Sequence, residues 1–195
     1  MMIKKQAKIL SDKQQKLALT FIQGTRYPLR NKVIFLLSVK AGLRAKEISC
    51  ITWSMISDSQ GQVCDALTLQ DNASKGKSGR IIWLSKELKD ALIEYKASER
   101  KYSSSNYVIT SERSEKVNSQ IIVNFFGTLF KNLQFEGASS HSGRRTFITN
   151  AARKITSVGG SLRDVQQLAG HSSLSTTQRY IEFDSEAMKK VVELV

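Results

Sequence analysis

The feature that most constrains the fold is an apolar run that begins at the single proline of the chain, Pro28. Residues 29–39 are apolar on most faces of a helix, and residues 33–37 read Val-Ile-Phe-Leu-Leu without interruption. Proline suits the first turn of a helix, and a helix that is apolar on most faces is buried. The run therefore predicts a central buried helix that begins at Pro28 and ends near Ala41-Gly42.

Amphipathic segments before and after this run predict further helices. Ser11 and Gln14 have the spacing of a capping box, so a first helix is expected to begin near Asp12. Its apolar residues then recur at helical intervals. Further helix starts are expected at Ser85, at Asn118 or Ser119, at His141, at Ser161 and, with Gln178 completing a capping box, at Ser175, just before Tyr180.

One part of the chain has a different character. Residues 66–69 and 80–84 have the pattern of strands, and the polar, glycine-containing residues 70–79 separate them. This pattern predicts a β-hairpin with a long tip that carries Lys75 and Lys77. Flexible glycines would let an ammonium group reach a bound phosphate, although a solvated basic turn explains the same residues. The fold class is therefore α+β and mainly α, with a small antiparallel sheet on one side.

The length and charge of the chain limit the possible partners. A chain of 195 residues suffices for one domain with a substantial core, so residues 1–195 are expected to form a single domain. Its 30 Lys and Arg residues against 17 Asp and Glu give a net charge of +13. Such an excess favours a polyanionic partner, with nucleic acid as the leading candidate. The alternative is a basic protein that is merely soluble.

The cysteines and the hydropathy indicate the compartment. Cys50 and Cys64 have neither metal-ligand spacing nor a disulfide framework, which fits a reducing cytosol. The N-terminus lacks the apolar core of a signal peptide, and no run reaches the roughly 18 apolar residues that a membrane span needs. We therefore expect an intracellular protein with no membrane segment. The tail from Ser185 has apolar residues at roughly helical spacing, suited to docking in the same chain or in a neighbour.

Two short motifs place polar side chains at helix ends. Gly42 ends one helix, so Arg44 lies in the opening turn of the next, with Glu47 on the same face. The alternative for Arg44 and Glu47 is a surface ion pair. His141 and His171 are the only two histidines, and both lie beside Gly or Ser. The helix start at His141 would present free N–H groups and a positive dipole end, which favour an anion.

Taken in order, six of these residues resemble the active-site set of the tyrosine recombinases, also called the phage integrase family. The resemblance covers nearly the whole chain and includes the stretch from Gly170 to Tyr180. The fold that it implies is the catalytic domain of that family. The six residues are Arg44, Lys75, His141, Arg144, His171 and Tyr180.

The resemblance implies a DNA recombinase or integrase that cleaves and rejoins DNA. Tyr180 would be the nucleophile, forming a 3′-phosphotyrosyl intermediate that a second 5′-hydroxyl can reverse without ATP. Arg44 and Arg144 would neutralise the charge that develops on the phosphate oxygens. His141 would assist the tyrosine as a base or hydrogen-bond partner, because a phenol is protonated at neutral pH. His171 would hydrogen-bond a phosphate oxygen.

The remaining roles are supporting ones. Lys75 would protonate the departing 5′-hydroxyl as general acid, and Glu47 would orient the helix of Arg44. No metal or other cofactor is expected. Contacts to double-stranded DNA are expected from Lys77, Arg80, Arg145 and Arg179.

The resemblance also implies an assembly and a setting. A homotetramer on two DNA sites is expected, with a monomer or weak oligomer in solution. The protein is expected to be of bacterial or phage origin and to act in the cytoplasm, in association with the nucleoid. Too few residues precede Arg44 to form the helical DNA-binding domain that most family members carry, so we expect that domain to be absent from residues 1–195. The chain is then either a catalytic-domain fragment or a short recombinase without that domain. Two alternatives are a catalytically idle DNA-binding regulator on the same fold and a type IB topoisomerase, which relaxes DNA without exchanging partners.

Overall fold

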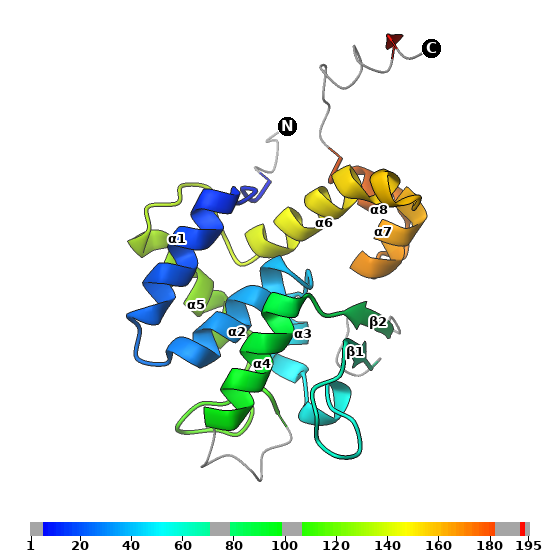
Figure 1. Ribbon diagram of the computed structural model, residues 1–195. Helices are drawn as coiled ribbons and strands as arrows, with labels where there is room; N and C mark the ends of the chain where they lie inside the picture. The colour runs from blue at the N-terminus through cyan, green and yellow to red at the C-terminus, as the bar shows by residue number, and fades with distance from the viewer. Residues whose placement is uncertain (1–5, 71–78, 99–106, 182–191, 194–195) are drawn as a thin grey trace.

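The computed structural model describes residues 6–70, 79–98, 107–181 and 192–193. Helices dominate this part of the chain, and one small sheet lies at their side (Figure 1). This architecture confirms the predicted mainly α fold. The elements are α1 (Asp12–Gln23), α2 (Pro28–Val39), α3 (Ala45–Cys50), η1 (Trp53–Met55), β1 (Ala66–Leu69), β2 (Arg80–Trp83), α4 (Lys86–Ser98), α5 (Ser119–Asn132), α6 (Ser142–Lys154), η3 (Ile155–Val158), α7 (Leu162–Ala169) and α8 (Leu174–Gln178).

Helix α2 is the centre of the core, as its apolar run predicts. Residues 33–39 are all buried, and Phe35 and Leu36 have no exposed surface. Helices α1, α4 and α6 contact α2 from different sides (Figure 1). Because α2 is covered along most of its length, its C-terminal end at Val39 holds the next turn, which contains Gly42 and Arg44, in a fixed position.

The sheet consists of the two predicted strands. Strands β1 and β2 pair antiparallel, with Ala66 opposite Trp83 and Leu69 opposite Arg80. Ile82 points into the core, whereas Ile81 and Trp83 are exposed. The second strand ends one residue earlier than predicted. The hairpin tip, with Lys75 and Lys77, lies outside the described residues.

Most of the predicted helix starts are confirmed by their caps. Ser11 forms the expected capping box with Gln14, and Asn118 caps α5. The prediction that Ser175 begins the last helix is wrong, because Ser173 occupies the N-cap position. The Ser173 hydroxyl accepts a hydrogen bond from the Ser175 backbone N–H, and its backbone is extended, as an N-cap requires.

The C-terminal helices form a second, smaller apolar cluster. Ile148 of α6 packs there with Val165 and Ala169 of α7, and Tyr180 packs against their edge. Helix α6 joins this cluster to the main core through α2, and α7 contacts β2 (Figure 1). The fold therefore brings four separate segments together: the α2–α3 junction, strand β2, the start of α6, and the region from α7 to Tyr180.

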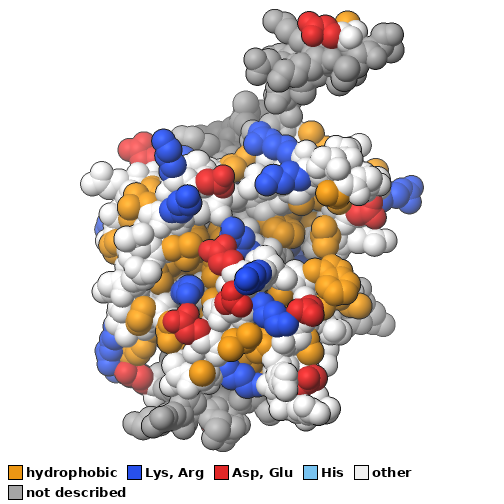
Figure 2. Space-filling model, viewed as in Figure 1, with side chains coloured by type: hydrophobic (Ala, Val, Ile, Leu, Met, Phe, Trp, Pro, Cys, Tyr) orange, Lys and Arg blue, Asp and Glu red, His pale blue; other side chains and the backbone are white. Residues whose placement is uncertain are grey.

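The surface over α4 is close to neutral. Figure 2 shows acidic and basic side chains interspersed with apolar ones on this face. Ion pairs join Glu87 to Lys40, Glu94 to Lys32, and Lys89 to Asp65. In the described ranges, no helix is long and apolar enough to cross a membrane.

Candidate active site

Arg44 is held at the junction of α2 and α3. Gly42 has a φ of +65°, and this turn places Arg44 at the N-cap of α3. The Arg44 backbone N–H donates to Glu47 Oε2 (2.8 Å), and its Nη1 donates to Glu47 Oε1 (3.0 Å). The Glu47 side chain has no exposed surface, whereas that of Arg44 is 29% exposed. The fully buried carboxylate of Glu47 therefore orients the guanidinium of Arg44, whose side chain still reaches solvent. A surface ion pair does not describe this contact, because Glu47 is buried.

Arg80 provides the second positive partner of Glu47. Its Nη1 and Nη2 donate to the two carboxylate oxygens at 3.1 and 3.3 Å, and its Nε donates to the Leu168 carbonyl oxygen (3.1 Å). Burial alone would raise the pKa of Glu47, but the hydrogen bonds and charges of Arg80 and Arg44 outweigh burial and lower this pKa. The Arg80 side chain is only 7% exposed. This placement argues against the expected DNA contact by Arg80.

Arg144 lies in the first turn of α6 and is 4% exposed. Its Nη1 donates to the Gly42 carbonyl oxygen (2.6 Å) and its Nη2 to that of Ala169 (2.5 Å). A guanidinium has five N–H donors, and the described residues occupy two of them. Burial and the neighbouring charge of Arg44 lower the pKa of Arg144 to about 10, so it stays charged at neutral pH.

His171 follows the residue that ends α7. Gly170 takes the left-handed conformation (φ +59°), which turns the chain so that only 7% of the His171 surface is exposed. Its Nδ1 lies 3.0 Å from the Oγ1 of the buried Thr177. Burial, with the positive charges of Arg144 and Arg44, lowers the pKa of His171 to about 4. The ring is therefore neutral at pH 7.

Tyr180 lies directly beside this histidine. The two rings stack with their centroids 5.3 Å apart and their planes at 25°. The Thr149 hydroxyl donates to the Tyr180 carbonyl oxygen (3.1 Å), which fixes the backbone at this point to α6. The side chain is half-buried. The phenol is thus held against His171 in the same chain, close enough for its charge to influence Arg144.

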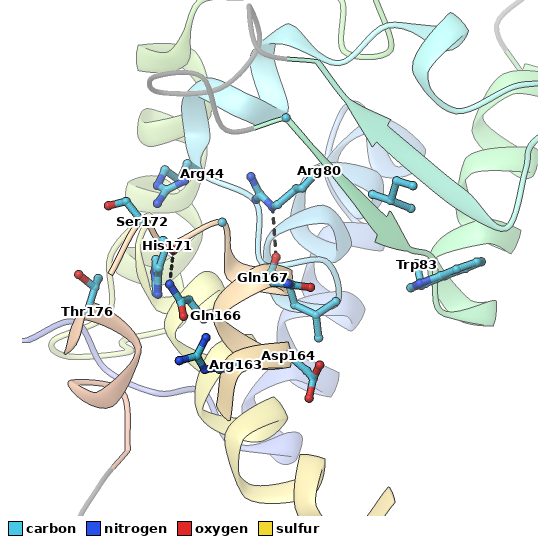
Figure 3. Close-up of a pocket in the computed structure, with 14 residues that line it drawn as sticks. Arg44, Arg80, Trp83, Arg163, Asp164, Gln166, Gln167, His171, Ser172 and Thr176 are labelled. Atoms are coloured by element: carbon cyan, nitrogen blue, oxygen red, sulfur yellow. Dashed lines mark hydrogen bonds between the residues drawn. The ribbon is translucent and has the colours of Figure 1, made fainter. Parts of the chain in front are cut away.

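A cleft of about 1350 Å³ opens between β2 and α7. Figure 3 shows Arg44 and His171 at one end of it, Arg80 between the strand and the helix, and Trp83 toward the other end. The exposed Arg163 of α7 also lines the cleft. An extended anionic ligand that entered the cleft would reach Arg44 and His171 at its end.

For some other predicted site residues, the described part of the structure gives no contact with the cluster of Arg44, Arg144, His171 and Tyr180. His141 is exposed at the N-cap of α6, and within the described residues its ring has no hydrogen bond to the Tyr180 hydroxyl. Lys75 and Lys77 lie outside the described residues. Arg145 is half-buried and Arg179 is exposed, so both roles on DNA stay predictions.

Two residues make contacts that the sequence did not predict. Thr177 had no predicted role, yet its hydroxyl contacts the His171 ring. Arg80 was assigned to DNA, yet it bonds to Glu47 and to Leu168. A buried role for Arg80 has no local signal, because its partners are 33 and 88 positions away.

The charges of the cluster suit a phosphate that gains negative charge. In the part of the chain that the structure describes, the guanidiniums of Arg44, Arg80 and Arg144 gather around one carboxylate, that of Glu47, so two positive charges stay uncompensated. A phosphodiester has one negative charge, and attack on phosphorus places more charge on its nonbridging oxygens. Fixed cations in a buried site stabilise that charge more strongly than water does.

Comparison with known proteins identifies the family. The model of the phage integrase family matches residues 8–186, and the chain therefore belongs to this family. A curated relative is the tyrosine recombinase XerA of Thermococcus kodakarensis, 28% identical over 188 residues, with 95% of this chain and 62% of the relative covered. Another is XerD of Halalkalibacterium halodurans, 29% identical over 171 residues, with 85% and 53% covered. The chain thus spans between half and two thirds of these relatives.

Solved structures show the same fold. The crystal structure of XerA recombinase superposes with a TM-score of 0.75 at 22% identity, covering 100% of this chain and 66% of the other. The integrase of the transposon Tn1549, solved with circular intermediate DNA, gives a TM-score of 0.76 at 18% identity, covering 100% and 67%. XerH bound to its difH substrate, in a post-cleavage complex, gives 0.75 at 18% identity, covering 94% and 51%.

Proposed function

We propose that this chain is the catalytic part of a site-specific DNA recombinase. The observation that supports this most strongly is the stacking of Tyr180 on His171, in one cluster with two arginines, Arg44 and Arg144. The curated relatives named tyrosine recombinases support the same activity. Double-stranded DNA is the proposed substrate, and the solved relatives that contain DNA agree with it.

The proposed reaction exchanges one phosphoester for another. The Tyr180 hydroxyl oxygen attacks the phosphorus, the bond from phosphorus to the 5′-oxygen breaks, and a 3′-phosphotyrosine forms. Arg44 and Arg144 hold the nonbridging oxygens, and the Nε2 of neutral His171 donates a hydrogen bond to one of them. His141 takes the phenolic proton, and Lys75 gives a proton to the departing 5′-oxygen. Attack by the 5′-hydroxyl of another strand reverses the step and joins new partners.

The assembly and the location are part of this proposal. Strand exchange between two duplexes requires four cleavages, so we propose four copies on two DNA sites, with a monomer or weak oligomer in free solution. The tail from Ser185 would dock within a copy or between copies. We place the reaction in the cytoplasm, where chromosomal and phage DNA are found together.

A covalent-capture experiment tests the activity across many target sequences at once. The full chain is incubated with a pool of nicked duplexes whose central positions are randomised. A nick next to the cleavage site lets the 5′-hydroxyl fragment diffuse away, so the phosphotyrosyl complex accumulates. We expect a DNA–protein band on a denaturing gel, and sequencing of its DNA should give a consensus.

Variants of three site residues serve as controls for the capture. Tyr180→Phe, Arg44→Ala and Arg144→Ala should each abolish the band, because arginine contacts in phosphoryl transfer are worth about 10³ to 10⁵ in rate. Circular dichroism checks that each variant is folded. Absence of a band from the unaltered chain at every sequence in the pool would favour the binding-only regulator. A band that persists in Tyr180→Phe would exclude Tyr180 as the nucleophile.

A further inference from the structure

Arg80 is the most constrained basic side chain of the cleft. Its guanidinium makes three hydrogen bonds, two to Glu47 and one to the Leu168 carbonyl oxygen, with 7% of the side chain exposed. Partners among the described residues thus occupy three of its five N–H groups, and almost none of its side chain faces solvent. An arginine that serves as a DNA contact needs an accessible fork, so this geometry is that of an internal support.

The first connection made by Arg80 leads to Arg44. Glu47 Oε1 accepts from Nη1 of Arg44 at 3.0 Å and from Nη1 of Arg80 at 3.1 Å. One buried carboxylate oxygen is therefore shared between the two arginines. Removal of Arg80 would leave Glu47 with Arg44 as its remaining cationic partner and would pull the Arg44 guanidinium further toward the carboxylate, away from a phosphate.

The second connection leads to His171. Leu168 is in the last turn of α7, where a cation is favourable beside carbonyl groups that lack partners in the helix. The guanidinium also lies against Gly170, where a Cβ atom would be only 2.7 Å from the Arg80 Nη1. Arg80 thus packs against the turn that directs His171 into the cleft. The chain at this turn is further held by a hydrogen bond from Gln166 Nε2 to the His171 carbonyl oxygen (3.0 Å).

We propose that Arg80 is a positioning residue that fixes Arg44 and His171 relative to each other, and that it does not contact DNA. Arg80 begins strand β2, five positions after Lys75, so it also ties the base of the hairpin to both catalytic segments (80 − 75 = 5). The expected effect on the rate of covalent-complex formation rests on the recombinase activity proposed above. The claim that Arg80 holds Arg44 and His171 in position does not depend on that activity.

The test compares Arg80→Lys with Arg163→Gln, a variant of the exposed arginine on the same cleft. Lysine keeps the charge but cannot make three bonds in a plane. For Arg80→Lys we expect the rate of covalent-complex formation at saturating protein to fall about 10- to 100-fold, as a displacement of about 1 Å would cause. We expect Arg80→Gln, which removes the charge, to keep the dependence of DNA affinity on salt that the unaltered chain shows. Arg163→Gln should instead reduce the salt slope by about one.

A second measurement reports on position in the free protein. The chain has two histidines, so ring resonances in a ¹H–¹⁵N spectrum are readily assigned to His141 and His171. Arg80→Lys should move the His171 resonances and leave those of His141 unchanged. Loss of folded protein would reduce the amplitude of complex formation, whereas mispositioning reduces its rate constant.

The outcomes separate this inference from the proposed function. If the unaltered chain forms no covalent complex, the recombinase proposal fails, and the salt slope and the His171 resonances still decide the role of Arg80. A salt slope lowered by about one in Arg80→Gln, with His171 resonances unchanged in Arg80→Lys, would make Arg80 a DNA contact and overturn the inference. Unchanged rate, slope and resonances would overturn it as well.

Discussion

Thr177 is the hydrogen-bond partner of the His171 ring. Its hydroxyl lies 3.0 Å from Nδ1, and within the described part of the chain it bonds to no other group. Burial and the surrounding arginines keep the ring neutral, and the proposed hydrogen bond from Nε2 to a phosphate requires that the Thr177 hydroxyl donate to Nδ1. His171 can then donate from Nε2 to a phosphate oxygen.

Replacement of Thr177 tests this hydrogen bond. Thr177→Val keeps the shape of the side chain but removes the hydroxyl, so the tautomer and the orientation of the ring are no longer fixed. We expect the rate of covalent-complex formation to fall about tenfold, which corresponds to about 1.4 kcal/mol and lies within the range for one hydrogen bond. Thr177→Ser keeps the hydroxyl and is the matched control. Equal rates for the Val and Ser variants would show that the hydroxyl has no such role.

The low pKa of His171 also predicts a pH-dependent stability. This pKa is about 4 in the folded chain, against an ordinary value of 6.5, so the unfolded chain binds more protons between these values. The stabilisation is fully present above pH 6.5 and is lost as the pH falls toward 4. The free energy of unfolding should therefore decrease by about 3 kcal/mol more in the unaltered chain than in His171→Gln. Urea unfolding at pH 6.5 and at pH 4 measures this change in both proteins. Equal decreases in the unaltered chain and in His171→Gln would contradict the prediction.

At the scale of elements, the site depends on two turns that follow helices, that of Gly42 after α2 and that of Gly170 after α7. Gly42 ends the turn after α2, with a φ of +65°, and its carbonyl oxygen accepts a hydrogen bond from Arg144. A Cβ atom there would be 2.4 Å from the Phe147 ring. The same glycine thus allows α6 to approach the end of α2 and brings Arg44 and Arg144 to one place.

Gly42→Ala should therefore destabilise the fold strongly. The left-handed backbone costs a non-glycine residue about 1–2 kcal/mol, and overpacking against Phe147 adds about 1–3 kcal/mol. Gly127→Ala, in the middle of α5 with open space around it, is the control and should stabilise by about 0.5–1 kcal/mol. Urea unfolding compares the two variants. A loss of less than 1 kcal/mol for Gly42→Ala would contradict the close packing at this turn.

The features that were predicted correctly from the sequence are those that depend on residues close together in the chain. The start of α2 at Pro28 and the capping box of Ser11 involve partners within a few positions, so the local pattern contains them. The start of α8 was predicted at the wrong residue because Ser173 and Ser175 both have cap chemistry, and the extended backbone of Ser173 decides between them. The roles of Arg80 and Thr177 depend on how distant turns meet, which no local pattern reports.

At the scale of the whole molecule, the fold assembles one anion site from segments far apart in sequence. The resemblance implies that the helix junction at Arg44 and the hairpin tip at Lys75 meet Tyr180 around one phosphate. The structure places Arg44 and Arg144 near His171 and Tyr180, and the hairpin tip lies outside the described residues. Ion pairs neutralise the surface over α4 (Figure 2), whereas the cluster at the cleft keeps two uncompensated positive charges. A polyanion is therefore attracted to the cleft more than to the surface over α4.

The central claim is that Tyr180 becomes covalently joined to DNA, and peptide mapping tests it most directly. The captured complex is digested with nuclease and then with trypsin, which cleaves after Arg179 and after Lys189 to release residues 180–189. Tyr180 is the single tyrosine in this peptide. We predict that mass spectrometry finds the peptide with a nucleotide phosphate on Tyr180. A covalent complex whose adduct lies on any other residue would contradict the account.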